Sequence, residues 1–147
     1  MSNTIVVGYD GEAPAQRALD RAIEEARSSH ARLVVVAVFE MPLNPEAPQY
    51  FGTLDDSPSP TVPATAPPEL EAVFAQAQAR VEAAGVRADY VWAAGEPASM
   101  IVGAAKNRRA SMIVLGGHHH GFFGRIFGED VAGEVKREAG CDVLVVD

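Results

Sequence analysis

Residues 112–131 read MIVLGGHHHGFFGRIFGEDV, and their pattern is the clearest indication of the fold class. The first four residues form an unbroken apolar run, which is typical of a strand buried on both faces of a parallel sheet. Gly116 and Gly117 follow, and glycine lets the backbone turn sharply or come close to a ligand. At the far end, the acidic pair Glu129 and Asp130 stands where a helix is predicted to begin. A strand, a glycine turn, a loop and a helix N-terminus form the layout that holds phosphate groups in open α/β sheets.

The rest of the chain alternates between short apolar runs and segments with helical periodicity. This alternation predicts a doubly wound α/β domain over residues 1–147, with a parallel sheet and helices on both faces. The predicted strands are Ile5–Val7, Leu33–Phe39, Val86–Trp92, Met112–Leu115 and Val143–Val146. Helices are predicted to begin at Pro14 and at Pro97, and to span Glu69–Ala84 and Asp130–Ala139. Gly85 is the predicted cap of the helix that ends at Ala84.

Residues 41–68 interrupt this alternation, because they hold eight of the ten prolines. Proline removes a backbone donor, so neither helix nor sheet is expected to persist there. We predict a Pro-rich surface loop. A Pro-rich ligand for a partner domain is the less favoured alternative.

Composition excludes several classes of protein. The net charge of −8 argues against a nucleic-acid surface and against an anionic membrane face. No apolar run approaches the roughly 20 residues of a membrane span, and the N-terminus lacks the features of a signal peptide. Cys141 is the only cysteine, so no intrachain disulfide can form and a reducing cytoplasm is expected. No histidine is placed beside Cys141 by the sequence, which favours an inert thiol.

Several motifs, taken in order, resemble those of the universal stress proteins. The first strand ends in Gly8-Tyr9-Asp10-Gly11, the third helix is entered through Gly95-Glu96-Pro97, and the last third carries the runs IVLG and CDVLVV. The resemblance implies a five-stranded parallel sheet of order 3-2-1-4-5, in the adenine nucleotide alpha hydrolase-like fold. It also implies a stress-response or regulatory domain rather than an enzyme.

Family members that hold ATP carry G-x2-G-x9-G-[ST] after the fourth strand. Counted from Gly116, the later positions of this motif fall on His119, Glu129 and Asp130, so only the first glycine is kept. A carboxylate at the helix start accepts the free N–H groups there and repels phosphate. Two unit charges 4 Å apart repel by about 4 kcal/mol at an effective dielectric constant near 20. The resemblance therefore implies a degenerate ATP site, with Gly117 beside it, and disfavours ATP as a cofactor. An adenine-nucleotide-binding switch is the first alternative.

Two further positions match the family's nucleotide site. Asp10 would face the ribose or a metal, and Val38 would touch the adenine ring. The alternatives are a turn carboxylate that accepts local amides for Asp10, and simple strand packing for Val38.

Three adjacent histidines offer a different chemistry. His118 and His120 point the same way in an extended segment, and imidazole with carboxylate suits Zn²⁺. A metal-dependent hydrolase is therefore a further alternative. A polar loop that titrates near pH 6.5 is favoured over it.

The last strand suggests how the chain assembles. Val143, Leu144, Val145 and Val146 form an apolar run without proline or lysine, and the predicted order places this run at a sheet edge. Pairing of two such edges across a two-fold axis would cover both. The family resemblance also implies a homodimer through this strand. A monomer with a shielded edge is the alternative.

Overall fold

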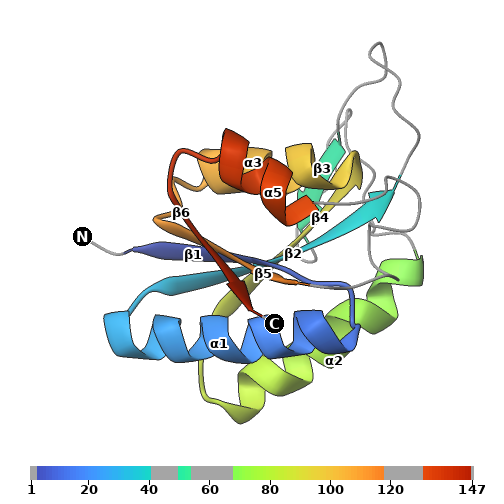
Figure 1. The fold of residues 1–147 in the computed structure, drawn as a ribbon. Helices are drawn as coiled ribbons and strands as arrows, with labels where there is room; N and C mark the ends of the chain where they lie inside the picture. The colour runs from blue at the N-terminus through green and yellow to red at the C-terminus, as the bar shows by residue number, and fades with distance from the viewer. Residues whose placement is uncertain (1–2, 41–49, 54–67, 118–130, 147) are drawn as a thin grey trace.

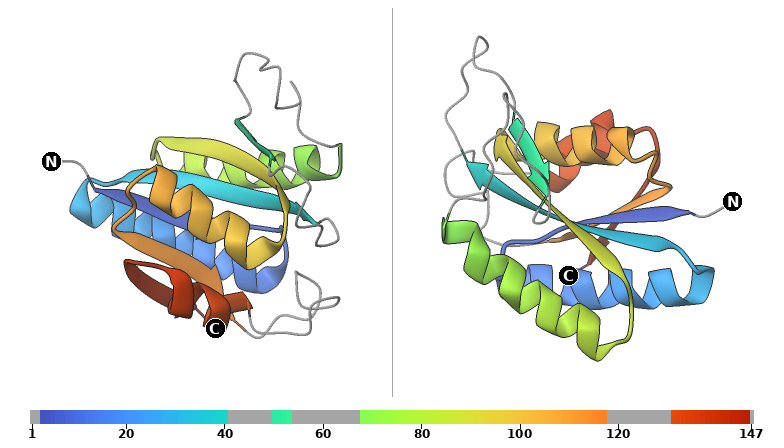
Figure 2. Two further views of the ribbon diagram at one scale, coloured as in Figure 1. Left: turned by 90° about the horizontal axis from the view of Figure 1, so that it is seen from above. Right: turned by 180° about the vertical axis from the view of Figure 1, so that it is seen from behind.

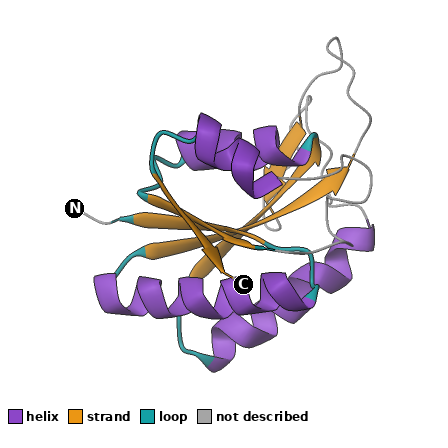
Figure 3. Ribbon diagram, viewed as in Figure 1, coloured by secondary structure: helices purple, strands orange, loops and turns teal. Residues whose placement is uncertain are grey.

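A computed structural model describes residues 3–40, 50–53, 68–117 and 131–146, which form one twisted sheet flanked by helices (Figure 1). The strands are β1 (Thr4–Gly8), β2 (Arg32–Glu40), β3 (Tyr50–Thr53), β4 (Ala88–Gly95), β5 (Met112–Gly116) and β6 (Asp142–Val146). The helices are α1 (Ala13–Ser29), α2 (Pro68–Ala83), α3 (Pro97–Asn107) and α5 (Val131–Glu138). Figure 3 shows the helices on both sides of the strands.

The strand order confirms the predicted topology. The sheet runs β3-β4-β2-β1-β5-β6, and the five strands from β4 to β6 are mutually parallel. Numbered without β3, these five strands have the order 3-2-1-4-5. The sequence order therefore reverses between β1 and β5, and this is the place where open α/β sheets bind ligands.

One part of the prediction was wrong. Residues 41–68 were expected to contain no sheet, yet Tyr50–Thr53 forms β3 and pairs antiparallel with β4, so that Phe51 lies opposite Ala93. The prolines of this segment lie on either side of the YFGT stretch and none lies within it. Aromatic and β-branched residues favour strands, and an edge position needs only one partner. In addition, Pro68 is the first residue of α2, a position that suits proline, and is not part of a loop.

The two faces of the sheet are buried by different helices. Helices α1 and α2 cover one face, and α3 and α5 cover the other (Figure 2). Along β2, Val34, Val36 and Val38 belong to the core under α3 and α5, whereas Leu33 and Val35 belong to the core under α1 and α2. Burial on both faces explains why this strand reads as an unbroken apolar run.

Three helices end with a residue in the left-handed conformation. These residues are His30 (φ 56°), Gly85 (φ 73°) and Arg109 (φ 52°). After α3, the N–H of Arg109 donates to the carbonyl of Lys106, and the N–H of Ala110 donates to the carbonyl of Ala105. These two bonds form a Schellman motif, in which the left-handed position is usually glycine. The predicted cap at Gly85 is thus confirmed, while His30 and Arg109 adopt the same conformation with a side chain.

Candidate functional site

Several predicted site residues lie together at the carboxyl ends of β1, β2 and β5. Gly8 lies opposite Val36, and Val7 lies opposite Val114. The turn after β1, with Asp10, therefore lies at the same level as the ends of β2 and β5. Val38 and Gly116 stand at those ends.

Asp10 has a local structural role. Its Oδ1 accepts a hydrogen bond from the backbone N–H of Glu12 at 2.9 Å. Glu12 is the N-cap of α1, and its own side chain makes no capping bond. The carboxylate of Asp10 therefore shapes the turn that leads into α1, as a turn aspartate commonly does.

The two glycines after β5 have structural roles as well. A Cβ added to Gly116 would lie 2.6 Å from the carbonyl carbon and oxygen of Pro14 and 2.9 Å from the nitrogen of Ala15. Any side chain here would therefore collide with the backbone of α1. The N–H of Gly117 donates to the carbonyl of Val146 at 2.8 Å, so it extends the pairing of β5 with β6.

Val38 is 7% exposed and belongs to the core cluster under α3 and α5. This burial matches simple strand packing. The remaining predicted site residues, His118, His119, His120, Glu129 and Asp130, lie outside the described residues. Helix α5 begins at Val131, immediately after the acidic pair.

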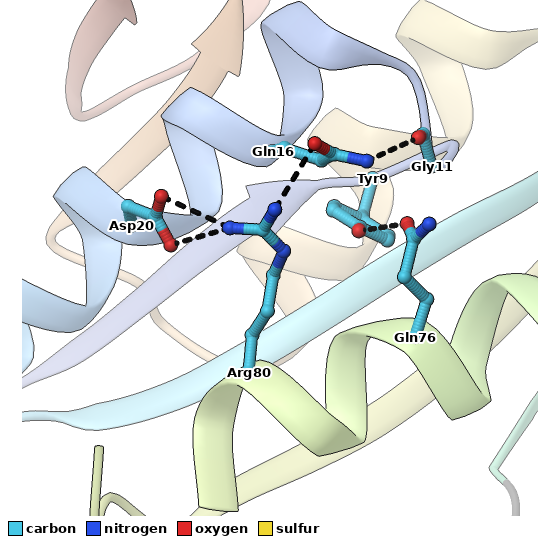
Figure 4. Close-up of polar contacts among 6 residues, drawn as sticks. All are labelled: Tyr9, Gly11, Gln16, Asp20, Gln76 and Arg80. Atoms are coloured by element: carbon cyan, nitrogen blue, oxygen red, sulfur yellow. Dashed lines mark hydrogen bonds and ion pairs between the residues drawn. The ribbon is translucent and has the colours of Figure 1, made fainter. Parts of the chain in front are cut away.

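A polar network that the sequence did not predict connects α2 to the turn after β1 (Figure 4). The guanidinium of Arg80 donates to both carboxylate oxygens of Asp20 at 3.0 Å and to Oε1 of Gln16 at 3.0 Å. Gln16 in turn donates to the carbonyl of Gly11 at 2.9 Å. The network holds the turn that carries Asp10 against the two helices. Because Arg80 is 60 residues from Asp20, no local sequence signal could reveal the pair.

Tyr9 lies beneath this turn and is fully buried. Its hydroxyl donates to Oε1 of Gln76 on α2, and its backbone N–H donates to the carbonyl of Val36. Burial raises the pKa of the Tyr9 hydroxyl above its usual 10.0, and nearby Arg80 opposes this rise. Tyr9 is therefore neutral near pH 7 and acts as a hydrogen-bond donor.

The N-terminus of α3 carries its own carboxylate. Glu96 accepts the N–H of Ser99 at 2.9 Å and the N–H of Ala98 at 3.4 Å, so it caps the helix. Partial burial raises the pKa of Glu134 on α5, and the negative charges of Glu96 and Glu138 raise it further. These carboxylates place negative charge between α3 and α5.

Within the described part of the chain, no three histidine, cysteine or acidic side chains are grouped so that they could hold a metal ion. The predicted pair His118 and His120 is outside that part. Nor does any described helix have the length and apolar character needed to cross a membrane.

Comparisons with known proteins identify relatives of the same length. The profile described as the universal stress protein family matches residues 1–147. A universal stress protein of Thermus aquaticus is 33% identical over 147 residues, which are 99% of each chain.

Solved structures share the fold. The crystal structure of a universal stress protein in complex with cAMP is 24% identical and has a TM-score of 0.69, with 99% of this chain and 96% of that chain covered. The universal stress protein of Archaeoglobus fulgidus in complex with dAMP is 20% identical and has a TM-score of 0.66, with 100% and 98% covered. Because the family profile matches the whole sequence and a relative is one-third identical from end to end, the chain belongs to the universal stress protein family.

Proposed function

We propose that the chain is a cytoplasmic stress-response domain with a regulatory rather than an enzymatic role. On this proposal, the region at the carboxyl ends of β1, β2 and β5 is a degenerate adenine-nucleotide site. It retains weak affinity for nucleotides with little phosphate charge and binds ATP least well. Relatives of the same fold were crystallised with cAMP and dAMP, which supports the adenine part of the proposal.

The main support for the proposal is that the two glycines at the end of β5 both have structural roles. Gly116 packs against the backbone of α1, and the N–H of Gly117 is donated to Val146. The surviving first glycine of the phosphate motif thus has a reason to be present without any phosphate. The later motif positions carry His119, Glu129 and Asp130, which add bulk and negative charge. Asp10 and Val38 would be the residues on the ribose and adenine side.

A calorimetric titration series tests this proposal. AMP, cAMP, ADP and ATP are each titrated into the full chain without added metal. We expect dissociation constants weaker than about 100 μM, with ATP the weakest ligand, because each added phosphate charge approaches the acidic pair. A micromolar dissociation constant for ATP would contradict the proposal. It would favour the second candidate, an adenine-nucleotide-binding switch, which the nucleotide complexes of the relatives support.

A triple variant tests the cause of the weak binding. Glu129→Gly, Asp130→Ser and His119→Gly together restore the family's phosphate motif. Removing charge beside the phosphates should raise ATP affinity by roughly a hundredfold, with a smaller rise for AMP. Glu69→Gln with Glu71→Gln, two exposed changes on α2, is the matched control for the loss of two negative charges. If the triple variant binds ATP no better than the parent, charge exclusion is the wrong explanation.

We further propose that two copies pair through β6. This strand ends the sheet, and Val143, Leu144, Val145 and Val146 are each partly exposed. Among the described residues, β5 is its only paired neighbour. An apolar edge of this kind favours pairing with a second strand.

A further inference from the structure

A cavity of about 210 Å³ lies at the end of the sheet opposite the candidate nucleotide site. Its walls come from the last turns of α3, the turn that leads into β5, and the turn between α5 and β6. These segments meet at the amino ends of β5 and β6, whereas Asp10 and Gly116 stand at carboxyl ends. We call this hollow the basal cavity. It is smaller than the roughly 300 Å³ at which sites for drug-sized ligands begin, so it suits a compact ligand.

The inner wall of the basal cavity is apolar. Val102, Ala105 and Ile113 line it and are buried in the core under α3 and α5. Ala110 and Ala139 add small side chains that are partly exposed. A ligand that fills the hollow would therefore remove apolar surface from water, which favours binding.

The rim of the basal cavity is cationic. Lys106 and Arg109 line it, and both are exposed. Among the described residues, neither side chain makes an ion pair or a hydrogen bond, although the adjacent Arg108 pairs with Asp89 at 3.0 Å. Two cations that have no acidic partner in the described part of the chain thus line one apolar hollow, in a protein of net charge −8.

The backbone at Arg109 has the same left-handed conformation as the backbone at His30. Arg109 occupies the left-handed position of the Schellman motif after α3, with φ 52°. Glycine fits this conformation without steric conflict, and a non-glycine residue there is strained. Here the side chain places a guanidinium on the rim of the basal cavity.

We propose that the basal cavity binds a small amphiphilic carboxylate. The apolar body of the ligand packs against Val102, Ala105 and Ile113, and its carboxylate lies between Lys106 and Arg109. A carboxylate on an apolar tail matches an apolar wall with a cationic rim. Inorganic phosphate matches it less well, because its charged oxygens would be desolvated beside the apolar wall at a cost in free energy. A guanidinium also forms favourable bidentate hydrogen bonds with a carboxylate.

Cys141 provides a local reporter, since its thiol belongs to the cavity wall. Burial raises the pKa of this thiol above its usual 9.0, and the charge of Asp142 raises it further. A raised pKa leaves less of the reactive thiolate near pH 7. At pH 9 the thiol can be labelled with iodoacetamide, and an occupied cavity should slow that labelling.

Octanoate is the probe, and octanol and inorganic phosphate are its controls. Binding to the full chain is followed by amide chemical shifts in NMR and by the rate of Cys141 labelling. We expect octanoate to shift resonances around Ala105, Ile113 and Cys141, with a dissociation constant on the order of 1 mM or tighter. Octanol should bind more weakly, and phosphate should cause no local shifts. If octanol bound as tightly as octanoate, the proposed role of Lys106 and Arg109 would be wrong. If phosphate bound as tightly as octanoate, the proposed role of the apolar wall would be wrong. No shift up to about 10 mM octanoate would overturn the whole proposal.

Two variants separate binding from folding. Arg109→Gly relieves the strained backbone, so it should make the chain more stable while octanoate binds about fivefold more weakly. Lys106→Gln should weaken octanoate by a similar factor. Lys136→Gln is the matched control, because Lys136 is an exposed helical lysine that does not line the cavity. If octanoate binds Arg109→Gly and Lys106→Gln as tightly as it binds the control, the two cations do not hold the ligand.

Discussion

The residues that end α1, α2 and α3 share one backbone conformation, but only Gly85 adopts it without a side chain. The left-handed conformation costs roughly 1–2 kcal/mol for a residue with a Cβ atom. His30 is exposed, and its backbone N–H donates to Ala26 to close the helix. The conformation is therefore imposed by the helix end and not by any contact of the imidazole described here.

His30→Gly should consequently stabilise the chain. We expect a gain of about 1 kcal/mol in the free energy of unfolding, because the relief of strain exceeds the extra entropy of glycine in the unfolded state. Urea denaturation of the two proteins measures this difference. Glu24→Gly, in the middle of the same helix, is the control and should destabilise by about 1 kcal/mol. A destabilised His30→Gly protein would show that the histidine side chain itself supports the helix end.

Glu134 predicts a pH dependence of stability. Its pKa in the folded chain is raised above 4.5 by partial burial and by Glu96 and Glu138, so the folded state holds this proton at a higher pH than the unfolded state. The folded state is then favoured at low pH, and stability is lost as the pH rises through the raised pKa. Glu134→Gln should therefore raise the unfolding midpoint at pH 7, and the gain should vanish below pH 4.5. Thermal unfolding at pH 3.5 and pH 7 gives the comparison. An equal gain at both pH values would show that the charge is not the cause.

For single residues, the sequence predicts the backbone conformation only where the residue type strongly favours that conformation. Gly85 was predicted as a helix cap, and Glu96-Pro97 was predicted to open α3, where Glu96 now accepts two backbone N–H groups. His30 and Arg109 gave no such signal, since their residue types do not require the left-handed conformation. The bond between Arg80 and Asp20 joins distant parts of the chain and depends on how α1 and α2 pack. It follows from the tertiary structure alone.

At the level of elements, β5 and α1 lie close together beside the candidate site. The backbone of α1 at Pro14 lies where a Cβ on Gly116 would stand. Backbone atoms cannot move aside as the end of a side chain can, so a methyl group would push helix and strand apart.

Gly116→Ala should therefore lower the free energy of unfolding by about 1–3 kcal/mol, the usual effect of overpacking. Gly140→Ala is the matched control, because a Cβ there would meet no atom within 4 Å. Urea denaturation of both variants measures the difference. Equal stability of the two variants would mean that α1 can shift without penalty.

The parallel strands and the helices α1, α2, α3 and α5 follow from apolar periodicity, because each buries one stripe or both faces in a shared core. The strand β3 could not be predicted in the same way. Four residues between proline clusters give too short a pattern, and their pairing depends on the free edge that β4 offers. Similarly, Asp10 follows β1 and Val38 lies near the carboxyl end of the adjacent β2, yet the contacts described for both are structural ones.

At the scale of the whole molecule, the outer edge of β6, which pairs with no other strand among the described residues, is the feature with the greatest consequence. The N–H of Gly117 donates to the carbonyl of Val146, so Val146 and Leu144 turn their backbone groups toward β5. Alternate residues of a strand point these groups to opposite edges. The backbone groups of Val143 and Val145 therefore face outward and are available to a second chain.

Light scattering should accordingly give about twice the chain mass of 15.5 kDa. Val145→Pro removes an outward donor and should yield a monomer whose fold is intact. Leu144→Pro is the control, since it removes a donor that faces β5 and should unfold the edge of the sheet itself. Circular dichroism distinguishes the two results. A parent protein that is a monomer at micromolar concentration would contradict pairing through β6.

The collision at Gly116 also bears on how this family changes over evolutionary time. A glycine that is needed for helix packing stays in place whether or not a descendant still binds a nucleotide. Selection on folding would preserve it long after selection on ligand binding had ended. In this chain the first glycine of the motif is therefore a poor marker of nucleotide binding, because its packing against α1 is enough to explain its presence.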